Sequence, residues 1–218
     1  MSLQSELDAF KNAWLERVGP DTAKLVDQDN LALQALADNA LRAGDRFPAI
    51  VLRNQLGEDI DLGELTRTQP LVVTFYRGGW CPYCNLELRA YQKTLPEIEA
   101  LGAWLIAVTP ETPDNSLSTA EKNDLSFPVF SDARGQLSEA LGIRFELSPA
   151  IQALYQKFGH DLPTRNGDDR WSLPMPATFV VAKGGVIAFA FVDPDYRKRL
   201  DPDVAVDVLR SLAAKTAA

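Results

Sequence analysis

The chain has 218 residues, enough for one hydrophobic core with some length to spare, and its formal net charge of -8 makes it acidic. An acidic protein repels nucleic-acid phosphates and anionic membrane surfaces, so we expect neither as a partner. The N-terminus, MSLQSELDAF, has neither a basic start nor an apolar core, and no apolar run is long enough to span a bilayer. We therefore expect no secretory signal and a cytoplasmic location, where thiols stay reduced.

Residues 1–43 are predicted to form an N-terminal helical extension. Apolar residues repeat at helical spacing from Leu3 to Trp14, Gly19-Pro20 interrupts the pattern, and a second helix follows. The extension would dock on the main domain or on a partner subunit, as in a homodimer, or it would simply be part of one continuous core.

Residues 44–218 are predicted to form one α/β domain. Residues 71–76 and 103–108 are apolar runs typical of buried strands, and the helix between them makes a βαβ unit. Two hairpins, a third strand and several helices should complete a central mixed sheet flanked by helices. The further predicted elements are a hairpin of 49–53 with 58–62, a helix at 115–124, a strand at 127–130, a mostly helical stretch at 135–158, a polar loop at 159–174, a hairpin of 178–182 with 186–192, and a helix at 202–216.

The only two cysteines, Cys81 and Cys84, stand three positions apart where a helix is predicted to begin. So short a loop stabilises almost nothing when closed, which makes chemistry the better explanation for the pair. Free backbone N–H groups and the positive end of the helix dipole favour a thiolate at Cys81. Pro82 suits the first helical turn, and Cys84 is near enough to form a disulfide with Cys81.

A metal site is disfavoured, because zinc usually takes four ligands and the chain offers two cysteines and one distant histidine, His160. No organic cofactor is implied either, since there is no glycine-rich nucleotide-binding pattern.

The stretch from Phe75 to Cys84, FYRGGWCPYC, resembles the peroxiredoxin-like branch of the alkyl hydroperoxide reductase and thiol-specific antioxidant family, within the thioredoxin superfamily. The order of elements from about Gly44 to Val192 is similar to that of the same family. The resemblance implies a thioredoxin-like fold and thiol-dependent reduction of hydroperoxides.

Two patterns of that superfamily overlap at the dithiol. Trp80 and the Cys-Pro-Tyr-Cys that follows resemble thioredoxins and glutaredoxins, in which the first cysteine, here Cys81, attacks. In the peroxiredoxin pattern Cys84 takes the place of the peroxidatic cysteine, Cys81 replaces a threonine or serine, and Arg77 replaces a proline. The order of attack therefore stays open.

Pro176 stands where peroxiredoxins carry an active-site arginine and resembles the cis proline of thioredoxins. The resemblance implies a cis Met175–Pro176 bond that faces the dithiol. Arg170, a few residues earlier, is expected to remain on the surface.

The sequence also suggests roles for four more side chains, three of them near the motif and the fourth, His160, much farther along the chain. Arg77 would either favour a thiolate and hold a peroxide oxygen or be a solvated loop residue. Trp80 would shield the sulfurs, form a docking surface or pack in the core, and Tyr83 would be exposed and touch a substrate. His160 is expected on the surface.

The sequence thus predicts an antioxidant oxidoreductase that reduces hydroperoxides through a Cys81/Cys84 dithiol–disulfide cycle. A thioredoxin- or glutathione-type donor would restore the dithiol. One alternative is a protein disulfide reductase with Cys81 as the attacking thiol, and another is a redox sensor without turnover.

Overall fold

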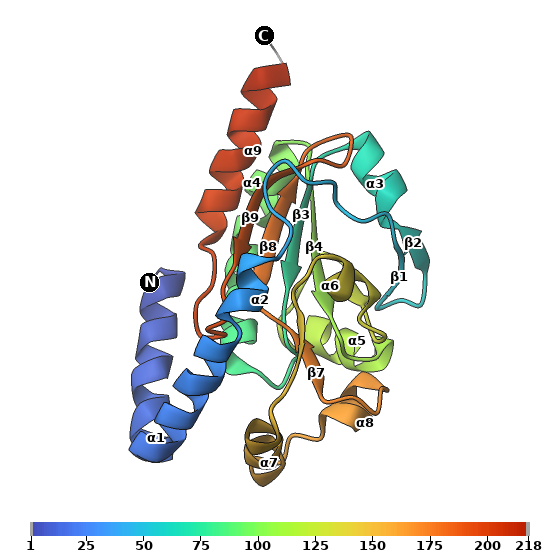
Figure 1. Cartoon of the computed structure of the whole chain (residues 1–218). Helices are drawn as coiled ribbons and strands as arrows, with labels where there is room; N and C mark the ends of the chain where they lie inside the picture. Colours follow the sequence, from blue (N-terminus) through green and yellow to red (C-terminus); the bar gives the residue numbers. More distant parts are fainter. Residues whose placement is uncertain (1, 217–218) are drawn as a thin grey trace.

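The structure is a computed structural model, described for residues 2–216, and it contains one seven-stranded mixed sheet with helices on both faces (Figure 1). The strand order is β2-β1-β5-β4-β3-β8-β9, and β6 and β7 form a separate small sheet. The strands are β1 (Val51–Asn54), β2 (Asp59–Asp61), β3 (Leu71–Phe75), β4 (Trp104–Thr109), β5 (Val129–Ser131), β6 (Arg144–Glu146), β7 (Ser172–Pro174), β8 (Ala177–Val181) and β9 (Ile187–Val192). The helices are α1 (Leu3–Ala32), α2 (Gln34–Asp38), α3 (Leu62–Thr68), α4 (Pro82–Ala100), α5 (Pro113–Lys122), α6 (Gln136–Ala140), α7 (Pro149–Lys157), α8 (Leu162–Asn166) and α9 (Pro202–Thr216).

Strand β3 lies near the middle of the sheet, parallel to β4 and antiparallel to β8. Its five residues are all buried, as its unbroken apolar run predicts for a strand covered on both faces. Successive side chains point to opposite faces, so Val72 packs in the cluster beneath α1, α4 and α9, while Val73 packs in the cluster with α2, α3 and α6. The predicted α/β class with a central mixed sheet is confirmed.

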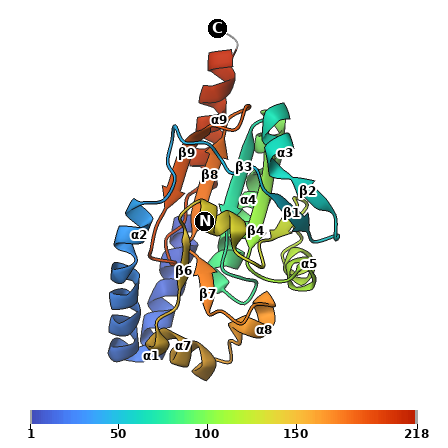
Figure 2. The same ribbon diagram turned by 45° about the vertical axis from the view of Figure 1, so that its right-hand side comes forward.

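Helix α1 consists of two helical runs that meet at Gly19, whose φ of 77° is in the left-handed region that glycine tolerates. This confirms the predicted break. The two runs fold back side by side, and both views place α1 beside α7 at one end of the molecule (Figures 1 and 2). The arm formed by α1 also contacts α4, the helix that follows the dithiol. The division of the chain at residue 43 stays a prediction.

The expectations for residues 135–158 and 159–174 were wrong in part. The first stretch contains strand β6 between two helices, and the second contains helix α8 and strand β7. The two strands pair antiparallel, with Phe145 opposite Leu173. Three-residue strands are too short to show an alternating pattern, so their pairing across 28 positions left no local signal.

No helix within residues 2–216 combines the length and the apolar character that crossing a membrane requires.

Replacement of Leu71 tests the central position of β3. The side chain of Leu71 is 0% exposed, so Leu71→Ala should lower the free energy of unfolding by about 2–5 kcal/mol through lost burial and a residual cavity. The matched control is Leu56→Ala in the β1–β2 turn, where the side chain is 69% exposed and the cost should stay below about 0.5 kcal/mol. Urea unfolding followed by circular dichroism measures both, and equal losses would contradict this placement.

Candidate active site

The dithiol lies at the junction of β3 and α4. Cys81 is the N-cap of α4, with extended backbone angles of φ -88° and ψ 116°, and Pro82 is the first helical residue, as predicted. The connecting loop turns through Gly78, whose φ is 147°, and a Cβ there would collide with the Trp80 indole. The glycine therefore allows the loop to bring Cys81 to the positive end of the helix.

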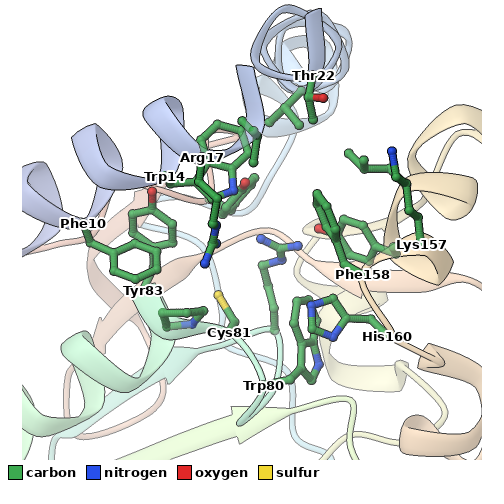
Figure 3. Close-up of a pocket in the computed structure, with 17 residues that line it drawn as sticks. Phe10, Trp14, Arg17, Thr22, Trp80, Cys81, Tyr83, Lys157, Phe158 and His160 are labelled. Atoms are coloured by element: carbon green, nitrogen blue, oxygen red, sulfur yellow. The ribbon is translucent and has the colours of Figure 1, made fainter. Parts of the chain in front are cut away.

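The two sulfurs have different access to solvent. Cys81 is 2% exposed and borders a cavity of about 630 Å³, whereas Cys84 is 0% exposed and does not line it. Both thiols are free. Figure 3 shows the Cys81 sulfur facing the space between α1 and the segment that carries Lys157, Phe158 and His160. A small solute in this cavity therefore meets Cys81 first.

The two cysteines share a single favourable negative charge, which rests on Cys81. Burial would raise the pKa of Cys81, but a hydrogen bond with Cys84 and the positive charges of Arg77 and Arg199 lower it to about 6. Burial raises the pKa of Cys84 well above its usual range, and the charge on Cys81 raises it further. At neutral pH Cys81 is therefore the thiolate and Cys84 the thiol.

Two donors nevertheless hold the Cys84 sulfur. The backbone N–H of Arg77 donates to Sγ at 3.4 Å, and Nη2 of Arg199 donates to it at 3.3 Å. These contacts would stabilise a negative charge on the Cys84 sulfur once Cys81 no longer carries a negative charge.

Arg199 is held in turn by a buried polar network. Its Nε donates to Oε2 of Glu87 at 2.7 Å, and Thr74 donates to the other carboxylate oxygen at 3.2 Å. Thr178 and Tyr91 extend the chain of hydrogen bonds. Burial raises the pKa of Glu87 to about 7, although the charge of Arg199 opposes the change.

Sequence reasoning missed Arg199 and Glu87. Arg199 lies 115 positions after Cys84, beyond the last strand, and nothing in its local sequence distinguishes it from a surface arginine. Glu87 lies on α4 three positions after Cys84, on the face that the apolar residues of the helix also use, and this was the only available signal.

Arg77 is buried and lies among aromatic rings, so its interpretation as a solvated loop residue was wrong. Its guanidinium carbon is 3.9 Å from the ring centroid of Tyr196, 5.0 Å from that of Trp80 and 5.5 Å from that of Tyr155. Such contacts let ring faces take the place of water around the cation. The positive charge lies close enough to Cys81 to lower its pKa, and no ion pair of Arg77 with a carboxylate is found within residues 2–216.

Tyr83 is buried, and its predicted exposure was wrong. Its ring packs edge-on against Phe10 at 5.0 Å and against Tyr196 at 5.7 Å. The covering residue Phe10 belongs to α1, whose docking position had no signal near the motif. Tyr83 still lines the cavity, as does Trp80.

His160 was predicted to lie on the surface, yet it is half-buried against Trp80, with ring centroids 4.6 Å apart. Burial, followed by the charges of Arg165 and Arg77, lowers the pKa of His160, so its imidazole is neutral at pH 7. It forms part of the cavity wall.

Pro176 lies near Arg77 at a narrow second cavity, but the predicted cis bond was wrong, because residues 2–216 contain no cis peptide. The residue before it, Met175, donates its backbone N–H to Ile143 at 2.8 Å and so continues the β6–β7 pairing. The extended backbone then continues directly into β8. Arg170 pairs with Asp168 and borders another cavity, consistent with its predicted surface position.

Within the described part of the chain, no three histidine, cysteine or acidic side chains cluster in a way that would hold a metal ion.

Comparison with known proteins shows which family the chain belongs to. The model of the AhpC/TSA family matches residues 43–190. Among curated proteins, Peroxiredoxin Bcp of Escherichia coli K12 is 29% identical over 110 residues, which cover 50% of this chain and 70% of that protein. The thiol-disulfide oxidoreductase ResA of Halalkalibacterium halodurans is 33% identical over 50% of this chain and 61% of its own length.

Solved structures show the same fold at low sequence identity. Peroxidoxin BcpB of Mycobacterium tuberculosis superposes with a TM-score of 0.62 at 19% identity and covers 79% of this chain and 98% of its own. Peroxiredoxin Q of Xanthomonas campestris gives 0.58 at 22% identity, with 79% and 97% coverage. Since the family model spans well over half of the residues, the chain belongs to the AhpC/TSA family and is a peroxiredoxin-type enzyme of the thioredoxin superfamily.

Proposed function

We propose that the protein reduces hydroperoxides with Cys81 as the attacking thiolate and Cys84 as the resolving thiol. The observation that carries this proposal is the asymmetry of the pair. Cys81 has a pKa of about 6 and borders the cavity, while Cys84 is sealed from it and has a raised pKa. A nucleophile needs both ionisation and access, and Cys81 has both.

In the first step, the Cys81 thiolate attacks one oxygen of the peroxide and the O–O bond breaks. The leaving alkoxide takes up a proton and departs as an alcohol, which leaves Cys81 as a sulfenic acid. The charges of Arg77 and Arg199 lie close to the reacting sulfur and would stabilise the electrons as they move to the departing oxygen.

In the second step, Cys84 attacks the Cys81 sulfenic acid and expels water, so that a disulfide forms. Loss of the thiolate on Cys81 removes the repulsion that raises the pKa of Cys84. The Arg77 N–H group and the Arg199 guanidinium then favour the Cys84 thiolate that this attack requires.

An external thiol donor of the thioredoxin or glutathione type would reduce the disulfide by attack on Cys81, the sulfur that faces the cavity. Two electrons pass from the donor to the peroxide in each cycle. The formation of a homodimer and the cytoplasmic location stay predictions.

A second candidate function is disulfide reduction by the same pair. The partial relative ResA is named a thiol-disulfide oxidoreductase, and a low-pKa first cysteine suits attack on a disulfide equally well. The two functions differ in the oxidant, so parallel assays with peroxides and disulfides separate them.

Single-cysteine variants test the order of attack. Cys84→Ser should react once with peroxide and retain a Cys81 sulfenic acid, because the serine hydroxyl still donates a hydrogen bond but cannot close a disulfide. Cys81→Ser should lose peroxide consumption by a factor of about 10³ or more, since the remaining thiol is fully buried and does not border the cavity. Dimedone labelling followed by mass spectrometry identifies the oxidised sulfur. A dimedone adduct on Cys84 in the Cys81→Ser variant would contradict this order.

The pH dependence of thiolate formation tests the role of Arg199. Alkylation of Cys81 by iodoacetamide should rise with pH around a midpoint of about 6 and level off above neutrality. Arg199→Gln removes a positive charge that favours the thiolate, so the midpoint should move to higher pH. Circular dichroism checks folding, and Arg210→Gln, an exposed arginine paired with Glu97, is the control and should leave the midpoint in place. An unchanged midpoint in a folded Arg199→Gln protein would refute the role.

A further inference from the structure

The N-terminal arm builds one wall of the cavity over Cys81. Figure 3 shows Phe10, Trp14, Arg17 and Thr22 entering the wall from α1, opposite Phe158 and His160. These arm residues precede the region matched by the family model, which begins at residue 43. This wall of the cavity is therefore built by residues that lie outside the region that the family model describes.

The cavity has a charge character opposite to that of the whole protein. Its lining sets Arg17, Arg77 and Lys157 against the single negative charge of the Cys81 thiolate and includes no aspartate or glutamate, although the chain contains 30 acidic residues and has a net charge of -8. His160 is neutral at pH 7. A ligand with a negative charge would therefore meet attraction in the cavity and repulsion over much of the remaining surface.

Two of the three cations have no partner within the described part of the chain. No ion pair or hydrogen bond engages the side chains of Arg17 or Lys157, and both side chains are exposed. Arg77 instead packs against aromatic rings, and its charge lowers the pKa of Cys81. The two unpaired cations lie on opposite elements, α1 and α7, so both are available to an anionic group that enters the cavity.

The rest of the wall suits an apolar body. The uncharged lining is mostly aromatic and aliphatic, and the volume of about 630 Å³ is in the range of about 300–1,000 Å³ that small-molecule sites occupy. Hydrogen peroxide would use little of this surface. The apolar lining includes Phe10 and Trp14 of the arm, Trp80 and Tyr83 beside the dithiol, and Phe158.

We infer that the preferred oxidant is an organic hydroperoxide with an apolar body and a carboxylate, whose negative charge Arg17 and Lys157 bind while its peroxide group reaches Cys81. This inference rests on the proposed peroxidase function and adds the class of substrate. The chemistry balances as before: the O–O bond breaks, one oxygen stays on the Cys81 sulfur as a sulfenic acid, and the carboxylate-bearing alcohol leaves with a proton.

The test uses a matched pair of peroxides, cumene hydroperoxide and its para-carboxylate derivative, with hydrogen peroxide as a third oxidant. The full-length protein should consume the carboxylate peroxide with a kcat/KM about fivefold higher than that of cumene hydroperoxide, an advantage expected for two solvent-screened ion pairs. Added salt should reduce the advantage.

Charge-removing variants assign the effect to residues. Arg17→Gln and Lys157→Gln should each lose about half or more of the preference for the carboxylate, because each lowers kcat/KM for the carboxylate peroxide more than it lowers kcat/KM for cumene hydroperoxide. Lys93→Gln on the outer face of α4 removes the same charge away from the cavity and is the control, which should retain the preference. Equal rates with the two organic peroxides, or equal effects of the cavity and control variants, would overturn the inference.

A binding measurement keeps this test independent of turnover. Trp14 and Trp80 line the cavity, so the carboxylate-bearing alcohol product should change tryptophan fluorescence at lower concentration than the neutral alcohol does. Failure to consume any peroxide would refute the proposed function, whereas consumption with equal affinity for the two alcohols would refute only the substrate class.

Discussion

The site depends on two buried sulfurs that share one negative charge. Each sulfur is too buried to ionise easily by itself, yet the pair lies between the cations Arg77 and Arg199. Only one thiolate is favourable, and the hydrogen bond between the cysteines gives the charge to Cys81 and the proton to Cys84. The proposed order of reaction rests on this electrostatic asymmetry and not on the peroxiredoxin-like spacing of Cys84.

The fold supplies these charges from distant parts of the chain. Arg77 comes from the loop after β3, and Arg199 comes from the segment between β9 and α9. Glu87 on α4 holds Arg199, which is possible because α4 packs beside α9 on one face of the sheet. The α1 arm packs against α4 and forms one wall of the cavity. Both the reactivity of the dithiol and its access thus depend on tertiary contacts around a short local motif.

The local motif was predictable because its signals are contiguous. A buried strand, two glycines, Cys81, Pro82 and a helical pattern follow one another within about 20 residues, and together they predicted the β3–α4 junction. The α/β class and most of the larger elements followed from the same kind of periodicity. The division into arm and domain stays a prediction.

What the sequence did not reveal depends on contacts between distant positions. Arg199 acts on Cys84 across 115 positions, and Phe10 buries Tyr83 from an arm whose docking position had no marker in the motif. The short strands β6 and β7 are each stabilised by pairing with the other. The expected cis peptide bond before Pro176 was based on the resemblance to thioredoxins. In this chain the preceding residue, Met175, continues the β6–β7 pairing, and the bond is not cis.

The Glu87 carboxyl group makes the support of Arg199 sensitive to acidity. Burial raises the pKa of Glu87 to about 7, although the charge of Arg199 opposes the rise. Arg199 donates to this carboxyl group at 2.7 Å and also donates to the Cys84 sulfur at 3.3 Å. Near neutrality the carboxyl group therefore gains or loses a proton within a small change of pH, and the strength of the ion pair that holds the guanidinium beside the sulfurs changes with it.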